Sequence, residues 1–248
     1  MDSSASLIAL VALTFFAAGT VKGVTGMGLP TVAMAVLGAL LSPLAAAALL
    51  LVPSLVTNVW QLFAGPRFLP LVRRLWPMLI AILVATAASS AVLARGDTEA
   101  TAAVLGTVLI LYSAYTLLGR QLHVPPQAER WLTPLIGLST GAVTGATGVL
   151  VVPAVPYLQA LRFDKDELVQ ALGLSFTVST VGLAAGLYAH QALPTQQLAL
   201  SALAVPPALA GMAVGQAIRS GVSPSAFRKS VLTCLLLLGA EMALRPLI

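Results

Sequence analysis

Residues 22–30 read Lys-Gly-Val-Thr-Gly-Met-Gly-Leu-Pro, and residues 141–148 read Gly-Ala-Val-Thr-Gly-Ala-Thr-Gly. The Val-Thr-Gly core therefore occurs twice, 119 residues apart, and each copy lies within a long apolar stretch. Glycine at this density favours backbone conformations other than a regular helix. In a membrane, such backbone is stable only where protein buries it or where it lines a cavity. Matched helix breaks in the two halves of a membrane protein indicate the binding site of a transporter.

The composition around these motifs is that of a membrane protein. The chain has 248 residues, of which 58% are hydrophobic and 8% are charged, and its mean hydropathy is +0.97. Apolar runs of about 20 residues, the length that spans a bilayer, recur along the chain. No stretch between them is long enough for a soluble domain, so we predict an all-α polytopic membrane protein. The apolar segments are 5–41, 44–64, 76–94, 99–119, 132–160, 167–189, 195–218 and 225–247.

Several functions are excluded by what the sequence lacks. It has no GxxxxGK[ST] phosphate loop, so we expect transport to be driven by gradients or by the membrane potential. The formal net charge of +5 fits the Lys and Arg of cytoplasmic loops and does not indicate nucleic acid. No His or Cys cluster suits a metal ion, and no Ser–His pair suits a hydrolase. We therefore predict no cofactor, no metal and no enzymatic activity; the expected partners are a small anionic substrate and the lipid bilayer, with homo-oligomers left open.

Segments 5–41 and 132–160 are each too long for one ordinary span, and each contains a break. If each is a single tilted helix, the chain has eight spans; if each forms two pieces, it has ten segments in two groups of five. Eight spans divide the twelve loop Lys and Arg residues six against six. Ten segments place ten of them, including Arg120 and Arg228, on one side and leave only Arg95 and Arg245 on the other. Because cytoplasmic loops collect positive charge, the ten-segment topology is favoured.

An odd number of segments per half requires the second half to be inverted relative to the first. We therefore predict a first transmembrane repeat at 1–120, a linker at 121–131 and a second repeat at 132–248, with both termini outside the cytoplasm. Inverted repeats bring their matching breaks together near the bilayer midplane. Re-entrant hairpins at the two breaks would give the same parity, and remain an alternative.

The two breaks predict an anion site. A helix that begins inside the membrane exposes backbone N–H groups and carries a partial positive charge. The candidate half-helices are 27–41 and 148–160. Lys22 could supply a full positive charge, and the aligned residue of the second repeat is Gly141. The alternative is that the glycines allow close helix packing and that Lys22 extends toward the membrane surface.

Polar residues of the next helix in each half extend this predicted site. Asn58 and Gln61 lie one helical turn apart, and serines follow the second break at 175 and 179. These side chains could line a polar path, or they could form hydrogen bonds between helices. The predicted substrate-binding residues are Lys22, Gly23, Thr25, Gly26, Gly28, Asn58, Gln61, Thr144, Gly145, Thr147, Gly148, Ser175 and Ser179.

The glycine motif at 23–30, the Ala-rich helix at 45–52 and Asn58 together resemble the sulfite exporter TauE/SafE family of membrane permeases. The second half, from Gly137 through Gly148 to residues 173–175, resembles the second repeat of that family. The resemblance implies a multi-pass protein of the bacterial inner membrane that exports small sulfur-containing or carboxylate anions.

The resulting hypothesis is a secondary transporter that exports a small oxyanion, such as sulfite or an organosulfonate. A negative cell interior favours outward movement of anions by about 2.3 kcal/mol per charge per 100 mV, so export could proceed without a coupled ion. Two alternatives remain: a transporter of another ligand, such as a metal cation, and a non-transporting membrane subunit that scaffolds a partner.

Overall fold

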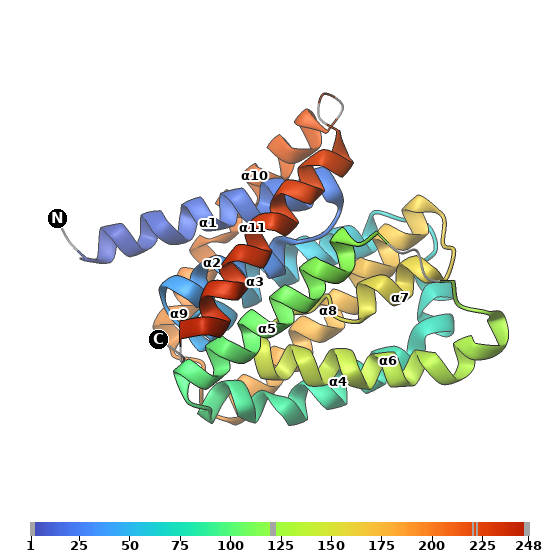
Figure 1. Cartoon of the computed structure of the whole chain (residues 1–248), viewed down its shortest axis with the longest axis horizontal. Coiled ribbons are helices and arrows are strands. Elements are labelled where there is room, and N and C mark those ends of the chain that lie inside the picture. Colours follow the sequence, from blue (N-terminus) through green and yellow to red (C-terminus); the bar gives the residue numbers. More distant parts are fainter. Residues whose placement is uncertain (1–2, 120–122, 220, 222, 246–248) are drawn as a thin grey trace. The chain divides into compact units, whose positions relative to one another are not determined.

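The computed structural model describes residues 3–119, 123–219, 221 and 223–245; Arg120 and the first two residues of the predicted linker lie outside this part. The described residues form eleven α-helices and no strand, which confirms the predicted all-α class (Figure 1). The helices are α1 (Ser3–Thr25), α2 (Leu29–Leu40), α3 (Pro43–Phe63), α4 (Phe68–Arg95), α5 (Thr98–Leu117), α6 (Pro126–Thr147), α7 (Ala154–Ala160), α8 (Lys165–Ala189), α9 (Thr195–Leu203), α10 (Val205–Ile218) and α11 (Pro224–Leu244).

Six stretches of the described chain are long and apolar enough to cross a membrane. They comprise most of α1, the whole of α3, α4, α5 and α8, and the stretch Gln196–Ile218 that covers α9 and α10. In contrast, α2 has 12 residues and α7 has seven. At 1.5 Å per residue, α2 is about 18 Å long, which is shorter than the hydrocarbon core of about 30 Å. Neither short helix is therefore long enough to cross the hydrocarbon core by itself.

Both predicted helix breaks are confirmed. α1 ends at Thr25 and α2 begins at Leu29, while α6 ends at Thr147 and α7 begins at Ala154. The second half-helix is thus shorter than the predicted 148–160. Residues 149–151 are not helical, because three of the four residues before Pro153 are valines and the residue before a proline disfavours the helical conformation. Since α2 packs against α1 and α7 against α6, each broken segment forms two separate pieces.

The helices group into two compact units, which we describe separately. Unit 1 comprises Met1–Pro53, Asp97–Leu118 and Leu193–Ile248; unit 2 comprises Ser54–Gly96 and Gly119–Ala192. Each unit therefore takes helices from both halves of the sequence. The division into sequence repeats at 1–120 and 132–248 stays a prediction, although α6 begins at Pro126 and so takes up residues 126–131 of the predicted linker.

In unit 1, α1 packs along α10, and α5 packs along α11 (Figure 1). Glycines allow these close contacts: a Cβ on Gly23 would lie 2.9 Å from the Cα of Gly215. The hydroxyl of Ser201 replaces the backbone hydrogen bond that Pro53 cannot make in α3. Proline has no N–H to donate to the carbonyl four residues earlier. The Oγ of Ser201 donates instead to the oxygen of Leu49 at 2.8 Å.

In unit 2, α4 packs along both α6 and α8 (Figure 1). Gly137, Gly141 and Gly145, spaced four residues apart on α6, face α4 closely; a Cβ on Gly141 would lie 2.6 Å from the Cβ of Ala85. At one end of this pair, Arg74 donates two hydrogen bonds to the Glu129 carboxylate, at 2.6 and 2.8 Å. Small residues and one bidentate ion pair thus fix α4 against α6.

Candidate functional site

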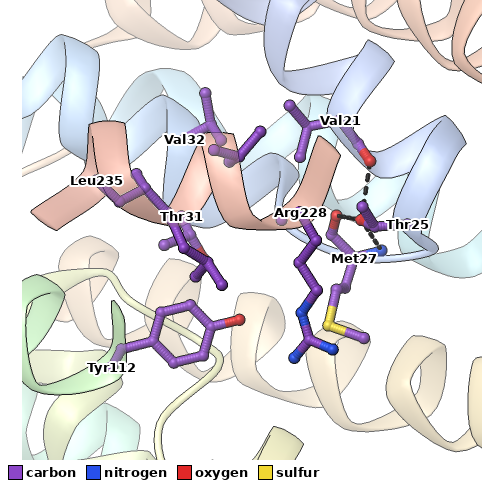
Figure 2. Close-up of a pocket in the computed structure, with 11 residues that line it drawn as sticks. Val21, Thr25, Met27, Thr31, Val32, Tyr112, Arg228 and Leu235 are labelled. Carbon is purple, nitrogen blue, oxygen red and sulfur yellow. Dashed lines mark hydrogen bonds between the residues drawn. The ribbon is translucent and has the colours of Figure 1, made fainter. Parts of the chain in front are cut away.

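The first break is built from a threonine followed by left-handed glycines. The Thr25 hydroxyl donates to the carbonyl oxygen of Val21 at 2.8 Å, and the Met27 N–H donates to the Thr25 oxygen at 3.3 Å (Figure 2). Gly26 and Gly28 have φ of 80° and 104°, in the region that favours glycine. The threonine hydroxyl therefore holds the last turn of α1 while the glycines turn the chain toward α2.

The second break repeats this local structure. The Thr147 hydroxyl donates to the carbonyl oxygen of Val143 at 2.7 Å, and the Val149 N–H donates to the Thr147 oxygen at 3.2 Å. Gly148 follows with a φ of 73° and ends α6. Each of these residues lies 122 positions after its counterpart in the first break, for example from 25 to 147. The two breaks therefore share these two hydrogen bonds and a left-handed glycine directly after the threonine.

The hydrogen bonds of the two breaks correspond at a spacing of 122 residues, about one helical turn more than the 119-residue spacing of the sequence motif. Thr25 matches Thr147 rather than Thr144. Lys22 consequently matches Thr144, whose hydroxyl donates to the oxygen of Val149 at 3.1 Å. The repeated Val-Thr-Gly motif does mark both breaks. Its threonine is the last residue of α1 in the first copy, but it lies three residues before the end of α6 in the second copy.

The predicted site glycines have two different structural roles. Gly26, Gly28 and Gly148 adopt positive φ and make the breaks. Gly23 and Gly145 lie earlier in their helices and face a neighbouring backbone; a Cβ on Gly145 would lie 2.8 Å from the amide nitrogen of Ser90 on α4. Close packing, the alternative considered for the glycines, therefore accounts for Gly23 and Gly145.

A small cavity adjoins the first break. It has a volume of about 20 Å³, enough for about one water molecule, and it is bounded by α1, α2, α5 and α11 (Figure 2). Thr25 and Gly28 line it, as does Thr31 of α2. The Thr31 hydroxyl is fully buried and has no hydrogen-bond partner within the described part of the chain. No side chain caps the start of α2 at Gly28, so the helix presents its first amides uncapped by side chains.

The charged residue that lines this cavity is Arg228, which the charge distribution of the sequence placed in a loop. Its side chain is half-buried and extends from α11 into the cavity, beside Tyr112 of α5 (Figure 2). Lys22 is also buried, with 3% exposure, but it does not line this cavity. Ser223 before Pro224 is a helix-start signal that places Arg228 in the second turn of a helix rather than in a loop.

Unit 2 carries buried polar groups on α3, α4, α6 and α8. Asn58 Nδ2 donates to Ser54 Oγ at 2.9 Å, and Ser54 Oγ shares a hydrogen bond of 3.2 Å with Thr180 of α8. Ser175 and Ser179 are fully buried, and neither hydroxyl has a hydrogen-bond partner among the described residues. The hydroxyls of Thr86 on α4 and Thr140 on α6 are likewise buried and have no hydrogen-bond partner among the described residues. The Asn58 bond lies within α3, and Ser54 carries the hydrogen bond that joins α3 to α8. Hydrogen bonding between helices, the alternative considered above, therefore does not account for the two buried serines.

The predicted site residues are divided between the two units. The residues of the first break lie in unit 1, and those of the second break lie in unit 2 together with the polar residues of α3 and α8. Within the described residues, no three His, Cys, Asp or Glu side chains are grouped closely enough to hold a metal ion. Unit 1 holds Lys22, Gly23, Thr25, Gly26 and Gly28; unit 2 holds Asn58, Gln61, Thr144, Gly145, Thr147, Gly148, Ser175 and Ser179.

Apolar helices long enough to span a bilayer, together with two matched helix breaks, define the class of polytopic membrane transport proteins. A family model described as sulfite exporter TauE/SafE matches residues 11–242. The chain therefore belongs to the sulfite exporter TauE/SafE family, a family of membrane permeases for sulfur-related anions, and the resemblance noted in the sequence is confirmed. Comparisons with curated proteins and with solved structures gave no match.

Proposed function

We propose that the protein is a secondary transporter that exports a small oxyanion, with sulfite or an organosulfonate as the substrate. The observation that carries this proposal is the duplicated break. Two helices of the same chain end in a threonine that bonds the preceding turn and a glycine in the left-handed region. Such irregular backbone within apolar segments is the usual construction of a transporter's binding site.

The residues around each break are proposed to contact the substrate, those of the first break in unit 1 and those of the second break in unit 2. Apart from Pro30, which has no N–H, the amides at the start of α2 provide donors for an anion, because side chains leave this helix end uncapped. Thr25 and Thr147 hold the ends of α1 and α6, and buried Lys22 adds positive charge near the first break. The remaining polar contributions are assigned to Asn58, Gln61, Thr144, Ser175 and Ser179, with Gly26, Gly28 and Gly148 shaping the backbone.

We further propose that the two halves are inverted repeats in a bacterial inner membrane, with both termini outside the cytoplasm. The order of helix lengths supports the duplication. In the first half, a long helix that ends at a break precedes a short one, and three longer helices follow. The second half repeats this order, with α9 and α10 together taking the place of α4.

Export follows from the membrane potential. A negative interior drives an anion outward by about 2.3 kcal/mol per charge per 100 mV, so a uniporter suffices. The residues that line the cavity at the first break include an arginine and no carboxylate. That lining favours an anion over a cation, and it offers no acidic proton carrier beside the substrate.

Efflux from proteoliposomes tests the proposal. Purified protein would be reconstituted into vesicles loaded with sulfite, and a potassium gradient with valinomycin would set the potential to either sign. We expect protein-dependent sulfite efflux that is faster when the interior is negative. Vesicles with folded protein that release neither sulfite nor a sulfonate above the protein-free control would refute the proposal. Movement of a metal cation instead would support the alternative ligand class, and folded protein that moves nothing would support a scaffold subunit.

A further inference from the structure

We propose that Arg228 and Thr31 form the recognition site for the oxygen atoms of the transported anion. This inference rests on the proposed function. It adds to the proposed site Arg228 of the last helix, α11, which lies beside the break between α1 and α2. The ligand class is a compact oxyanion that presents at least two oxygens on one face, such as sulfite, a sulfonate or a carboxylate.

The first observation is the position of Arg228. Its side chain enters a cavity lined by residues of α1, α2, α5 and α11, all within unit 1 (Figure 2). The ion pairs of the described residues belong to Arg67, Arg74 and Arg245. Arg228 has none of these carboxylate partners, and its half-buried side chain lines the cavity. A counter-charge stabilises a half-buried cation, and an anionic ligand would provide one.

The second observation is independent of charge. Thr31 lies in the first turn of α2 and lines the same cavity, and its buried hydroxyl has no partner in the described part of the chain. A buried hydroxyl without a hydrogen bond is unfavourable, so a native structure retains one mainly where a ligand or water completes it. An oxygen atom in the cavity would accept from this hydroxyl and would also face the start of α2, where the helix dipole favours negative charge.

The chemistry of the donors selects the ligand. A guanidinium is a planar fork that binds two oxygens of one anion at once, which a spherical halide cannot exploit. The cavity has room for about one water-sized group. It can therefore take an oxygen of the headgroup, while any organic part of the ligand remains outside it. A site of this kind should discriminate by the geometry of the oxyanion and not by charge alone.

Equilibrium binding to the purified full-length protein in detergent tests the inference. Titrations would compare sulfite, acetate and chloride for the wild type, Arg228→Gln, Arg228→Lys and Thr31→Val. Two matched controls are available: Lys229→Gln removes the same charge from the next, exposed residue, and Thr107→Val removes an exposed threonine hydroxyl of α5. Melting temperatures without ligand would show that each variant is folded.

We expect Arg228→Gln to weaken sulfite binding by about tenfold or more, as the loss of charge-assisted hydrogen bonds predicts. Arg228→Lys should recover only part of the affinity, because the charge remains but the fork is lost. Thr31→Val should weaken binding several-fold, and both controls should bind like the wild type. Chloride should bind at least tenfold more weakly than sulfite to the wild type.

Two results obtained with Arg228→Gln would overturn the inference and leave the proposed function intact. One is wild-type affinity for sulfite in Arg228→Gln; the other is an equal loss in Arg228→Gln and Lys229→Gln, which would indicate a general effect of surface charge. If Arg228→Gln does not fold, Arg228→Lys and Thr31→Val decide the matter, since unchanged affinity in both would also refute the site. If the wild type neither binds nor transports any of these anions, the proposed function fails and this inference fails with it.

Discussion

The threonine and glycine at each helix end act as a pair. In both breaks the hydroxyl bonds the carbonyl of the preceding turn, and the following glycine takes a φ that other residues adopt only with strain. This geometry is local, because its hydrogen bonds join residues only two to four positions apart. It is therefore the part of the candidate site that a short sequence motif can specify.

Gly148→Ala tests the backbone requirement at the second break. The φ of 73° should cost an alanine about 1–2 kcal/mol of stability. Asparagine tolerates this region better, so Gly148→Asn should be the milder of the two variants. Unfolding of the purified protein in a denaturing detergent would measure the difference. Equal stability of the wild type and Gly148→Ala would mean that the turn is not held in this conformation.

The sequence predicted the breaks but misplaced their correspondence and missed Arg228. The Val-Thr-Gly letters suggested a match between Thr25 and Thr144, whereas hydrogen bonding matches Thr25 with Thr147. A sequence motif cannot show which threonine ends the helix, since that depends on which of the following glycines adopts a positive φ. Arg228 lies over 190 positions from the break, so only tertiary packing brings α11 beside α2. Its neighbours in the sequence contained no sign of that contact.

At the scale of helices, α3 shows how a proline is accommodated in an apolar segment. Pro53 leaves the carbonyl of Leu49 without its usual donor, and Ser201 supplies one at 2.8 Å. Ser201→Ala should therefore destabilise the protein by about 1–3 kcal/mol, the cost of a buried unsatisfied group.

A double-mutant cycle isolates this effect. In the Pro53→Ala background, the new N–H can bond Leu49 within the helix, so Ser201→Ala should cost measurably less than in the wild type. Denaturant unfolding of the four proteins would give the coupling energy. Additive losses would show that Ser201 stabilises the protein in some other way, for instance through its bond from the Val52 N–H at 3.1 Å.

The contact between α4 and α6 depends on glycine in the same way that other membrane helix pairs do. A Cβ on Gly141 would lie 2.7 Å from the carbonyl oxygen of Ile82 and 2.6 Å from the Cβ of Ala85. Gly141→Val should force the helices apart and cost about 1–3 kcal/mol, as overpacking does.

Ala142→Val provides the matched control for that variant, because residue 142 is exposed on the same helix. It adds a branched side chain at a neighbouring position without facing α4. Melting temperatures of the two variants in detergent would separate a packing effect from a loss of helix propensity. Similar losses in both would argue against the close contact as the cause.

At the scale of the whole molecule, the apolar pattern was sufficient to predict the helical class and nearly every helix. It could not assign each helix to a compact unit. Unit 1 combines α1, α2 and α5 with α9, α10 and α11, which come from the opposite end of the chain. Hydrophobic periodicity carries no information on which long-range pairs form, since many apolar helix faces are chemically alike. Glycines at four-residue spacing, as on α6, were the one local sign of a specific pairing.

The distribution of positive charge makes the strongest prediction about the whole molecule. In the ten-segment topology, Arg73 and Arg162 lie in the cytoplasm and Arg95 lies outside; in the eight-span topology, Arg95 and Arg162 share a side and Arg73 lies opposite. Single cysteines at these three positions, in a Cys234→Ala background, would be labelled in intact cells with a membrane-impermeant maleimide. We expect label only at position 95. α2 and α7 are separate pieces, so each adds one reversal of the chain direction to its half of the sequence. Labelling at both 95 and 162, with position 73 protected, would instead establish the eight-span arrangement. Four spans per half leave both halves in the same orientation, so this result would also rule out inverted repeats.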